Sequence, residues 1–309
     1  LFKPLLFLGA GEAAHVAGTR DMDLMGGLGR RLPRTALLFL AGAVAISGLP
    51  PLNGFASEWL VYLGLFDRAR ASAGDALRAA WAVPALALTG ALALACFVKA
   101  YGAVFLGNPR GAEPHPHGEP RAHVAPMAVL AAACALLGLW PAGIAPALAR
   151  AAAIAAPGPA PRSELSDLAS LPTVGLSALG LVLLLGAVAL FQRRRLAAVP
   201  AAAGPTWDCG YARPTARMQY TASSFARGPV GWFGWALRPR LKGAPVERLF
   251  PAAARFESHV LDTVLDRAVV PVFRAGAWLA RQGRVLQHGR MQLYLVYVVA
   301  TLVALLFQV

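Results

Sequence analysis

Five ionisable side chains fall inside stretches of this sequence that are otherwise almost free of charge. They are Lys3, Glu12, His15, Glu58 and Lys99. Placing a charged group at the centre of a lipid bilayer costs about 2.5–3.5 kcal/mol on insertion scales, so such a group is usually retained for a function. Lysine, histidine and carboxylate side chains can all bind and release protons, and proton transfer is the chemistry that we expect of these five.

Lys3 lies fourteen residues before the predicted end of its helix at Ala17. At a rise of 1.5 Å per residue this places it about 21 Å from that end, within a hydrocarbon core about 30 Å thick. A lysine at that depth cannot easily extend its amine to the membrane surface. We expect a proton-exchanging group here, and the alternative is an ion pair that only holds two helices together.

Glu58 follows a predicted break in an apolar stretch. As one helix, residues 35–66 would be about 48 Å long, which exceeds the thickness of the hydrocarbon core. Glycine and proline disfavour a continuous helix, and the break is expected at Gly48, Pro50, Pro51 and Gly54.

A broken helix at membrane depth is tolerated where protein or a water-filled cavity satisfies the freed backbone groups, and such breaks recur at transport sites. Because Glu58 comes one turn after the break, we expect it to relay protons. The alternative is a kink in which Glu58 simply caps the second half-helix.

The other three ionisable residues lie nearer to the predicted ends of their helices. Lys99 precedes Gly107 by eight residues, so it is either an internal relay or an anchor that snorkels to the interface. Glu12 and His15 are three residues apart and share a helix face. They are candidates for a proton entry or exit, and simple solvation at the interface is the alternative.

Composition predicts an all-α integral membrane protein. Of the 309 residues, 57% are hydrophobic and 14% are charged, whereas about 25% charged residues is typical of a soluble domain. About 20 apolar residues span a bilayer as a helix. We expect about six spans, at residues 1–18, 35–66 (discontinuous), 79–106, 124–148, 171–192 and 291–309.

The basic residues predict how these spans are oriented. The net charge is +14, which is a pattern also found in nucleic-acid-binding proteins. Here, however, 22 of the Lys and Arg residues between the spans fall on one side and five on the other. This asymmetry is typical of membrane proteins, argues against a nucleic-acid partner and places residues 193–290 in the cytoplasm.

No pattern of cysteine and histidine predicts a metal site. The three cysteines have no CxxC spacing, and His115, His117 and His123 lie in a Pro-rich loop that we interpret as solvated. No nucleophile–base pair or phosphate-binding loop is evident either. We therefore expect no cofactor in this chain and no catalytic site of its own.

The basic segment 193–290 contains a predicted amphipathic helix. Apolar residues recur at a spacing of about four through 255–281, and Pro271 is expected to kink this helix. Such a helix suits a position along the membrane surface or against neighbouring subunits.

Two segments of the chain resemble a known family of membrane proteins. The FKPLLFL run around Lys3 and the SGLPPLNGF run before Glu58 are similar to the antiporter-like subunits of respiratory complex I, Mrp antiporters and membrane-bound hydrogenases. The resemblance implies that Lys3 is a central proton-path residue and that Glu58 is a terminal one on a discontinuous helix. The run WDCGYARPTARMQYTASSFAR at 207–227 resembles the group within this family that belongs to hydrogenase-4 and formate hydrogenlyase complexes.

This resemblance implies a cation-translocating subunit of a redox complex in a bacterial inner membrane. Its expected partners are the lipid bilayer and other membrane and redox subunits, which would carry nickel–iron and iron–sulfur centres. The alternatives are an Mrp-type sodium/proton antiporter subunit, a complex I proton-pumping subunit, or a membrane tether for the redox subunits. Whether protons or sodium ions move stays open.

The expected organisation has four parts. They are the C-terminal part of an antiporter-like core (1–148), a loop with an additional span (149–192), the basic segment with its lateral helix (193–290) and a terminal span (291–309). The chain opens with Leu1 inside an apolar run, and we expect the first half of the family's ion path to lie outside it.

Overall fold

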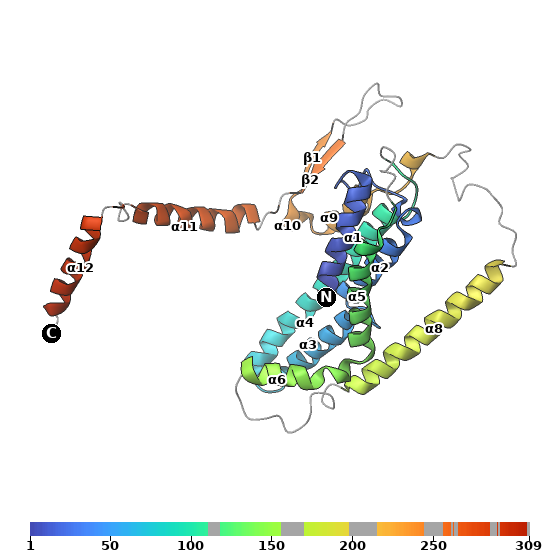
Figure 1. Ribbon diagram of the computed structural model, residues 1–309, viewed down its shortest axis with the longest axis horizontal. Coiled ribbons are helices and arrows are strands. Elements are labelled where there is room, and N and C mark those ends of the chain that lie inside the picture. The colour runs from blue at the N-terminus through green and yellow to red at the C-terminus, as the bar shows by residue number, and fades with distance from the viewer. Residues whose placement is uncertain are drawn as a thin grey trace. The chain divides into compact units, whose positions relative to one another are not determined.

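The computed structural model describes residues 1–110, 118–155, 170–197, 215–243, 256–260, 262, 265–284, 289 and 291–307. They form two units, Leu1–Ala226 and Arg227–Val309. Helices make up nearly all of the regular structure in the described residues (Figure 1). The helical membrane class predicted from composition is confirmed in this coarse form.

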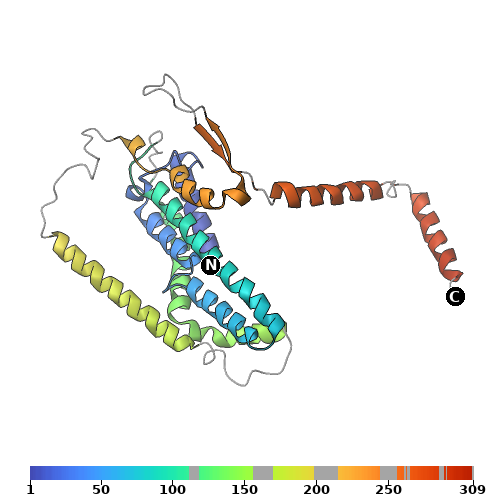
Figure 2. The same cartoon turned by 180° about the vertical axis from the view of Figure 1, so that it is seen from behind.

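The helices that begin in the described part of the first unit follow one another along the chain, and the last of them, α9, extends into the second unit. They are α1 (Phe2–Ala17), α2 (Pro33–Ile46), α3 (Asn53–Ala69), α4 (Ala73–Phe105), α5 (Arg121–Leu139), α6 (Ala145–Ala155), α8 (Leu171–Ala197) and α9 (Ala222–Trp232). Helices α1, α2 and α5 pack on one another, and α3 lies beside α4 (Figures 1 and 2).

The second unit contains short helices and one small sheet. Its elements are α10 (Gly234–Leu237), β1 (Arg240–Gly243), β2 (Phe256–His259), a π-helical turn (Leu265–Val269), α11 (Val270–Gly283) and α12 (Met291–Leu306). The antiparallel pair β1–β2 is a feature that the sequence pattern did not predict.

Three of the described helices are long and apolar enough to cross a membrane, namely α4, α5 and α8, and α2, α6 and α12 are shorter apolar helices. Leu183, Leu184 and Leu185 on α8 are each more than half exposed. Consecutive exposed leucines suit a helix surrounded by hydrocarbon, which is also where a helix is needed to satisfy its own backbone.

Local sequence accounts for where these helices begin and end. Ser72 Oγ accepts a hydrogen bond from the amide of Asp75 at 3.1 Å and so caps α4. Helix α1 ends at Gly18, whose φ of 65° is readily adopted by glycine alone. Pro33 occupies the first turn of α2, where its missing N–H costs nothing.

The stretch 124–148 is not one helix, contrary to our prediction. Helix α5 ends at Leu139, a single 3-10 turn follows at Pro141–Gly143, and α6 begins at Ala145. Pro141 has no backbone N–H and clashes with the preceding turn, which disfavours continuing the helix, and Trp140 before it has a non-helical backbone.

The prediction of one amphipathic helix over 255–281 is also wrong in its first part. Residues Phe256–His259 form strand β2, and helical structure starts only at Leu265. Pro271 lies in the first turn of α11, so it starts this helix instead of kinking it.

Among the clusters of buried side chains in the first unit, two bear on how α1, α2, α4 and α5 are arranged. In the larger of these Phe39 of α2 packs against Phe105 of α4, with ring centroids 5.2 Å apart, and Val16 of α1 belongs to the same cluster. The smaller cluster joins Leu52 to Cys134 of α5 and to Phe2 of α1. The smaller cluster therefore places the first turn of α1 at the level of residue 52.

Candidate functional site

The predicted break lies between α2 and α3, in the non-helical segment Ser47–Leu52, which we call the break. Gly48 adopts a φ of +64°, which favours glycine. Pro50 and Pro51 follow within the same segment, and Gly54 lies in the first turn of α3.

Backbones approach one another unusually closely around the break. A Cβ added to Gly54 would overlap the Ala45 carbonyl, lying 2.8 Å from its carbon. A Cβ added to Gly138 of α5 would lie 2.6 Å from the Cα of Leu52. Only glycine permits these contacts, so the two half-helices and α5 are locked together by main chain rather than by long side chains.

The carboxylate of Glu58 lies against the break. A Cβ on Gly48 would be 2.6 Å from its carboxyl carbon, and a Cβ on Gly90 of α4 would be 3.9 Å from both of its oxygens. Glu58 is half-buried. Within the described residues its carboxylate has no hydrogen-bond or ion-pair partner.

Two further polar atoms at the break are buried without a partner in the described structure, Oγ of Ser47 and Oδ1 of Asn53. Buried polar groups are normally hydrogen-bonded, because leaving one unpaired costs about 1–3 kcal/mol. The break thus gathers two unpaired polar atoms close to the unpartnered carboxylate of Glu58.

An apolar groove of about 400 Å³ adjoins the break. Pro50, Phe55 and Trp59 line one side of it, and Ser170 together with residues of α8 from Thr173 to Leu181 lines the other. The groove brings the additional helix α8 next to the discontinuous one.

Neither Lys3 nor Lys99 makes an ion pair with Glu58 in the described structure. Lys3 is exposed on α1, one residue after Phe2, which packs at the level of the break. Lys99 is half-buried on α4 and lies nine residues beyond Gly90. Nine residues rotate a helix by about half a turn and advance it by about 13.5 Å, so Lys99 faces away from the side that carries Gly90.

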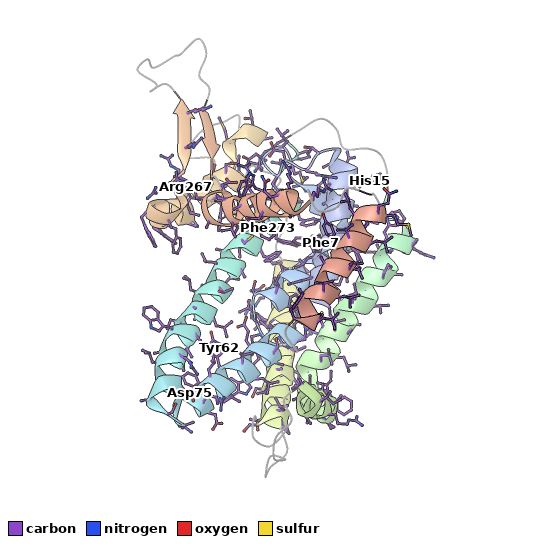
Figure 3. All side chains as sticks on the ribbon, turned by 90° about the vertical axis from the view of Figure 1, so that its left-hand side faces the viewer. Phe7, His15, Tyr62, Asp75, Arg267 and Phe273 are labelled. Carbon is purple, nitrogen blue, oxygen red and sulfur yellow. The ribbon has the colours of Figure 1, made fainter. Side chains whose placement is uncertain are left out.

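Glu12 pairs with a residue that the sequence interpretation did not select. Its Oε2 lies 2.8 Å from Nδ1 of His123, at the start of α5. The Glu12 side chain is 9% exposed and that of His123 is 56% exposed. His15 is exposed and lies at the end of the bundle that carries this pair, opposite the end with Tyr62 and Asp75 (Figure 3).

We call the end of the bundle that carries Glu12 and His123 the loop end. A second carboxylate at the loop end caps a helix. Oε1 and Oε2 of Glu119 accept hydrogen bonds from the amides of Thr35 (2.7 Å) and Arg34 (3.2 Å). These amides belong to the first turn of α2, where the helix dipole favours a negative charge. Glu119 therefore ties the segment before α5 to α2.

The motif around residue 219 is also bound to the loop end. Gln219 pairs with the backbone of Asn108 in both directions, accepting from its amide at 3.0 Å and donating to its carbonyl at 2.7 Å. Asp23 accepts from the amide of Ser223 at 2.9 Å. Arg110 donates to the carbonyl of Met25 at 3.1 Å and to that of Tyr220.

These contacts give a structural role to part of a motif that sequence reasoning used only for resemblance. We call the bound stretch, Thr215–Ser224, the clamp. Nothing in the local pattern around Gln219 indicates a partner that lies 111 residues earlier. Cys209 and the remainder of the motif before residue 215 lie outside the described residues, as do His115 and His117.

No group of three or more potential metal ligands occurs among the residues that the structure describes. His123, which the sequence places in a histidine-rich loop, hydrogen-bonds a carboxylate instead.

Comparison with known proteins shows which family the chain resembles. Residues 1–72 match the transmembrane family model described as NADH:quinone oxidoreductase/Mrp antiporter. Hydrogenase-4 component B of Escherichia coli (strain K12) is 36% identical over 100% of this chain and 48% of its own length. The chain belongs to this antiporter-like family.

Two more relatives match shorter parts of this chain. Formate hydrogenlyase subunit 3 of Escherichia coli (strain K12) is 35% identical over 73% of the chain and 36% of its own length. A Na(+)/H(+) antiporter subunit of Alkalihalophilus pseudofirmus is 30% identical over 45% of the chain and 26% of its own length. The chain thus spans about half, or less, of the length of these curated relatives.

Proposed function

We propose that this chain is part of a cation-translocating membrane subunit of a hydrogenase-4-like or formate hydrogenlyase-like complex, with protons as the favoured ion. The observation that carries the proposal is the carboxylate of Glu58, which lies unpaired against the broken helix and beside Gly90 of α4. The relatives named above support the class of complex.

The geometry of the break explains how Glu58 acts in this proposal. A carboxylate with a fixed cationic partner would stay ionised, whereas an unpaired one can accept and release a proton as its surroundings change. The unpaired oxygens of Ser47 and Asn53 supply neighbouring positions for water. Discontinuous helices are a recurrent way to expose such groups at membrane depth.

The other predicted residues keep secondary roles in the proposal. Lys3 lies at the level of the break and continues the path toward preceding parts of the full-length subunit. Lys99 faces away from Glu58, and we propose that it contacts a neighbouring subunit or the interface. Glu12 belongs to the loop end of the path, and His15 lies beside it.

The finer topology is proposed as well. We infer six spans, in which α2 and α3 form one discontinuous span, with α11 lying laterally and α12 anchoring the chain. The basic segment 193–290 faces the cytoplasm of a bacterial inner membrane. Nickel–iron and iron–sulfur centres belong to partner subunits, and this chain carries out no redox chemistry of its own.

The decisive experiment replaces Glu58 with Gln in the full-length subunit within its assembled complex. Glutamine keeps the size and hydrogen bonding of the side chain but cannot exchange a proton. We expect proton uptake by vesicles to fall at least tenfold while the complex still assembles. Asp75→Asn at the start of α4 is the matched control, since it also removes one carboxylate but lies at a capped helix end. Unchanged uptake in the Glu58 variant would refute the proposal.

A second candidate is a sodium/proton antiporter subunit, which the similarity to the antiporter subunit of Alkalihalophilus pseudofirmus favours. The same vesicles distinguish the two, because a sodium-coupled system requires a sodium gradient for proton movement whereas the first candidate does not.

A further inference from the structure

The loop end carries a pair of titratable groups that the path above does not explain. Glu12 lies almost wholly inside the bundle, and its carboxylate contacts the imidazole of His123 at 2.8 Å. We propose that this pair is a proton-access site, in which His123 passes protons between water and the buried Glu12. The inference rests on the proposed function and deepens it.

Exposure supplies the first argument. The imidazole is 56% exposed and the carboxylate 9% exposed, so one side chain reaches both water and a buried acceptor. An imidazole can both donate and accept a proton, which proton transfer requires and a contact that only holds α1 on α5 does not. Histidine also has two ring nitrogens, and here Nδ1 faces Glu12.

The transfer balances without any further reactant. Nδ1–H of the imidazolium donates its proton to the Glu12 carboxylate, which leaves a neutral imidazole and a carboxylic acid. The neutral imidazole keeps its proton on Nε2, so the exposed ring turns Nδ1 to water and takes a proton there from hydronium, and the carboxylic acid releases its own toward the interior. The same steps in reverse order release a proton to water.

His123 lies in the first turn of α5, at the exposed start of that helix. The other charged groups at this end are Arg121 on the same turn, Glu119 bound to the start of α2, and Arg34 and His15 on the adjoining helices. Arg121, Glu119 and Arg34 make no ion pair with Glu12 or His123 in the described structure.

The pair lies at some distance from the break. Phe2 packs at the level of the break and Glu12 is ten residues farther along α1, which is about 15 Å. The access site and the Glu58 site are therefore separate, and a substitution at one site does not contact the other.

The test uses the full-length protein in its assembled complex, reconstituted into vesicles. His123→Ala removes the imidazole from an exposed position and is expected to slow proton uptake about tenfold or more, in line with the loss of a positioned proton donor. Free imidazole in the medium is expected to restore a substantial part of that rate. Glu12→Gln is expected to slow uptake to a similar degree without rescue. Arg121→Gln, in the same exposed turn, is the matched control and is expected to behave as wild type.

Each result assigns the pair to one role. If His123→Gln restores the wild-type rate and imidazole does nothing for His123→Ala, the pair is a structural tie and the inference is overturned. Failure of both the His123 and the Glu12 variants to assemble would overturn it in the same way. If Glu58→Gln stops uptake while His123→Ala does not, the inference fails and the proposed function stands. If neither variant lowers uptake, both fail together.

Discussion

The break and the loop end hold their carboxylates in opposite ways. At the loop end Glu12, Glu119 and Asp23 each accept hydrogen bonds from a named partner. At the break Glu58 lies against bare glycine backbone with no partner among the described residues. A carboxylate that accepts hydrogen bonds is held in place by its partners, whereas burying an unpartnered one is energetically costly.

The packing of the two regions differs as well. Close main-chain contacts at glycine hold the break, and side-chain hydrogen bonds between distant segments hold the loop end. This difference predicts that adding even one methyl group at the break will be strongly destabilising. At the loop end, each substitution that removes a hydrogen bond should cost only a modest part of the stability. The following substitutions test the contrast.

The largest effect is expected for Gly54→Ala. The added Cβ would overlap the carbonyl of Ala45, and relieving this requires a backbone shift of the two half-helices. We expect a loss of about 3 kcal/mol in stability, at the upper end for overpacking, and little assembled subunit. Thermal unfolding of the purified complex measures this. Gly64→Ala, on the same helix with nothing within 4 Å, is the control, and equal damage from both changes would contradict the steric explanation.

Gly48→Ala should come next and act chiefly on transport. A Cβ there displaces the Glu58 carboxylate and strains a residue at φ +64° by about 1–2 kcal/mol. We expect proton uptake to fall about tenfold. Gly90→Ala places its Cβ at an ordinary contact distance of 3.9 Å, so uptake should change less than twofold. An equal loss of proton uptake in both variants would show that the contact of the Glu58 carboxylate with Gly48 is not what transport depends on.

Gln219→Ala should release the clamp while leaving the break intact. It removes two hydrogen bonds to Asn108, each worth about 1 kcal/mol. Hydrogen exchange at the amide of Asn108 should become faster, with no change at α3. Protection that persists in this variant would mean that other contacts hold the segment.

The smallest effect is expected for Glu119→Gln. Glutamine can still accept one hydrogen bond from the start of α2 but loses the charge that complements the helix dipole. A loss of about 0.5–1 kcal/mol is expected, measured by thermal unfolding at low and high salt. Because salt screens the charge, the difference from wild type should shrink as the ionic strength rises.

Prediction from sequence succeeded where a local pattern carries the information. The interruption between α2 and α3 lies where Gly48, Pro50 and Pro51 stand, because these residues restrict the backbone whatever surrounds them. The apolar run 124–148 predicts one helix, whereas α5 ends at Leu139, shortly before Pro141. In 255–281 an apolar spacing of four predicts helix throughout, although pairing with β1 makes its first part a strand.

Which groups lie together depended on packing between distant parts of the chain. The sequence pointed to His15 as the neighbour of Glu12 because three residues separate them, yet the structure pairs Glu12 with His123, 111 residues away. Likewise, nothing local to Gly90 indicates that it lies beside Glu58.

Composition alone determined that this is a helical membrane protein, because a low content of charge over about 20 residues allows little else. Proline and glycine determined where one helix is interrupted. Only the tertiary structure decided which carboxylates are paired and which is left free, since a hydrogen bond depends on distances of about 3 Å that the packing of α1, α2, α4 and α5 sets.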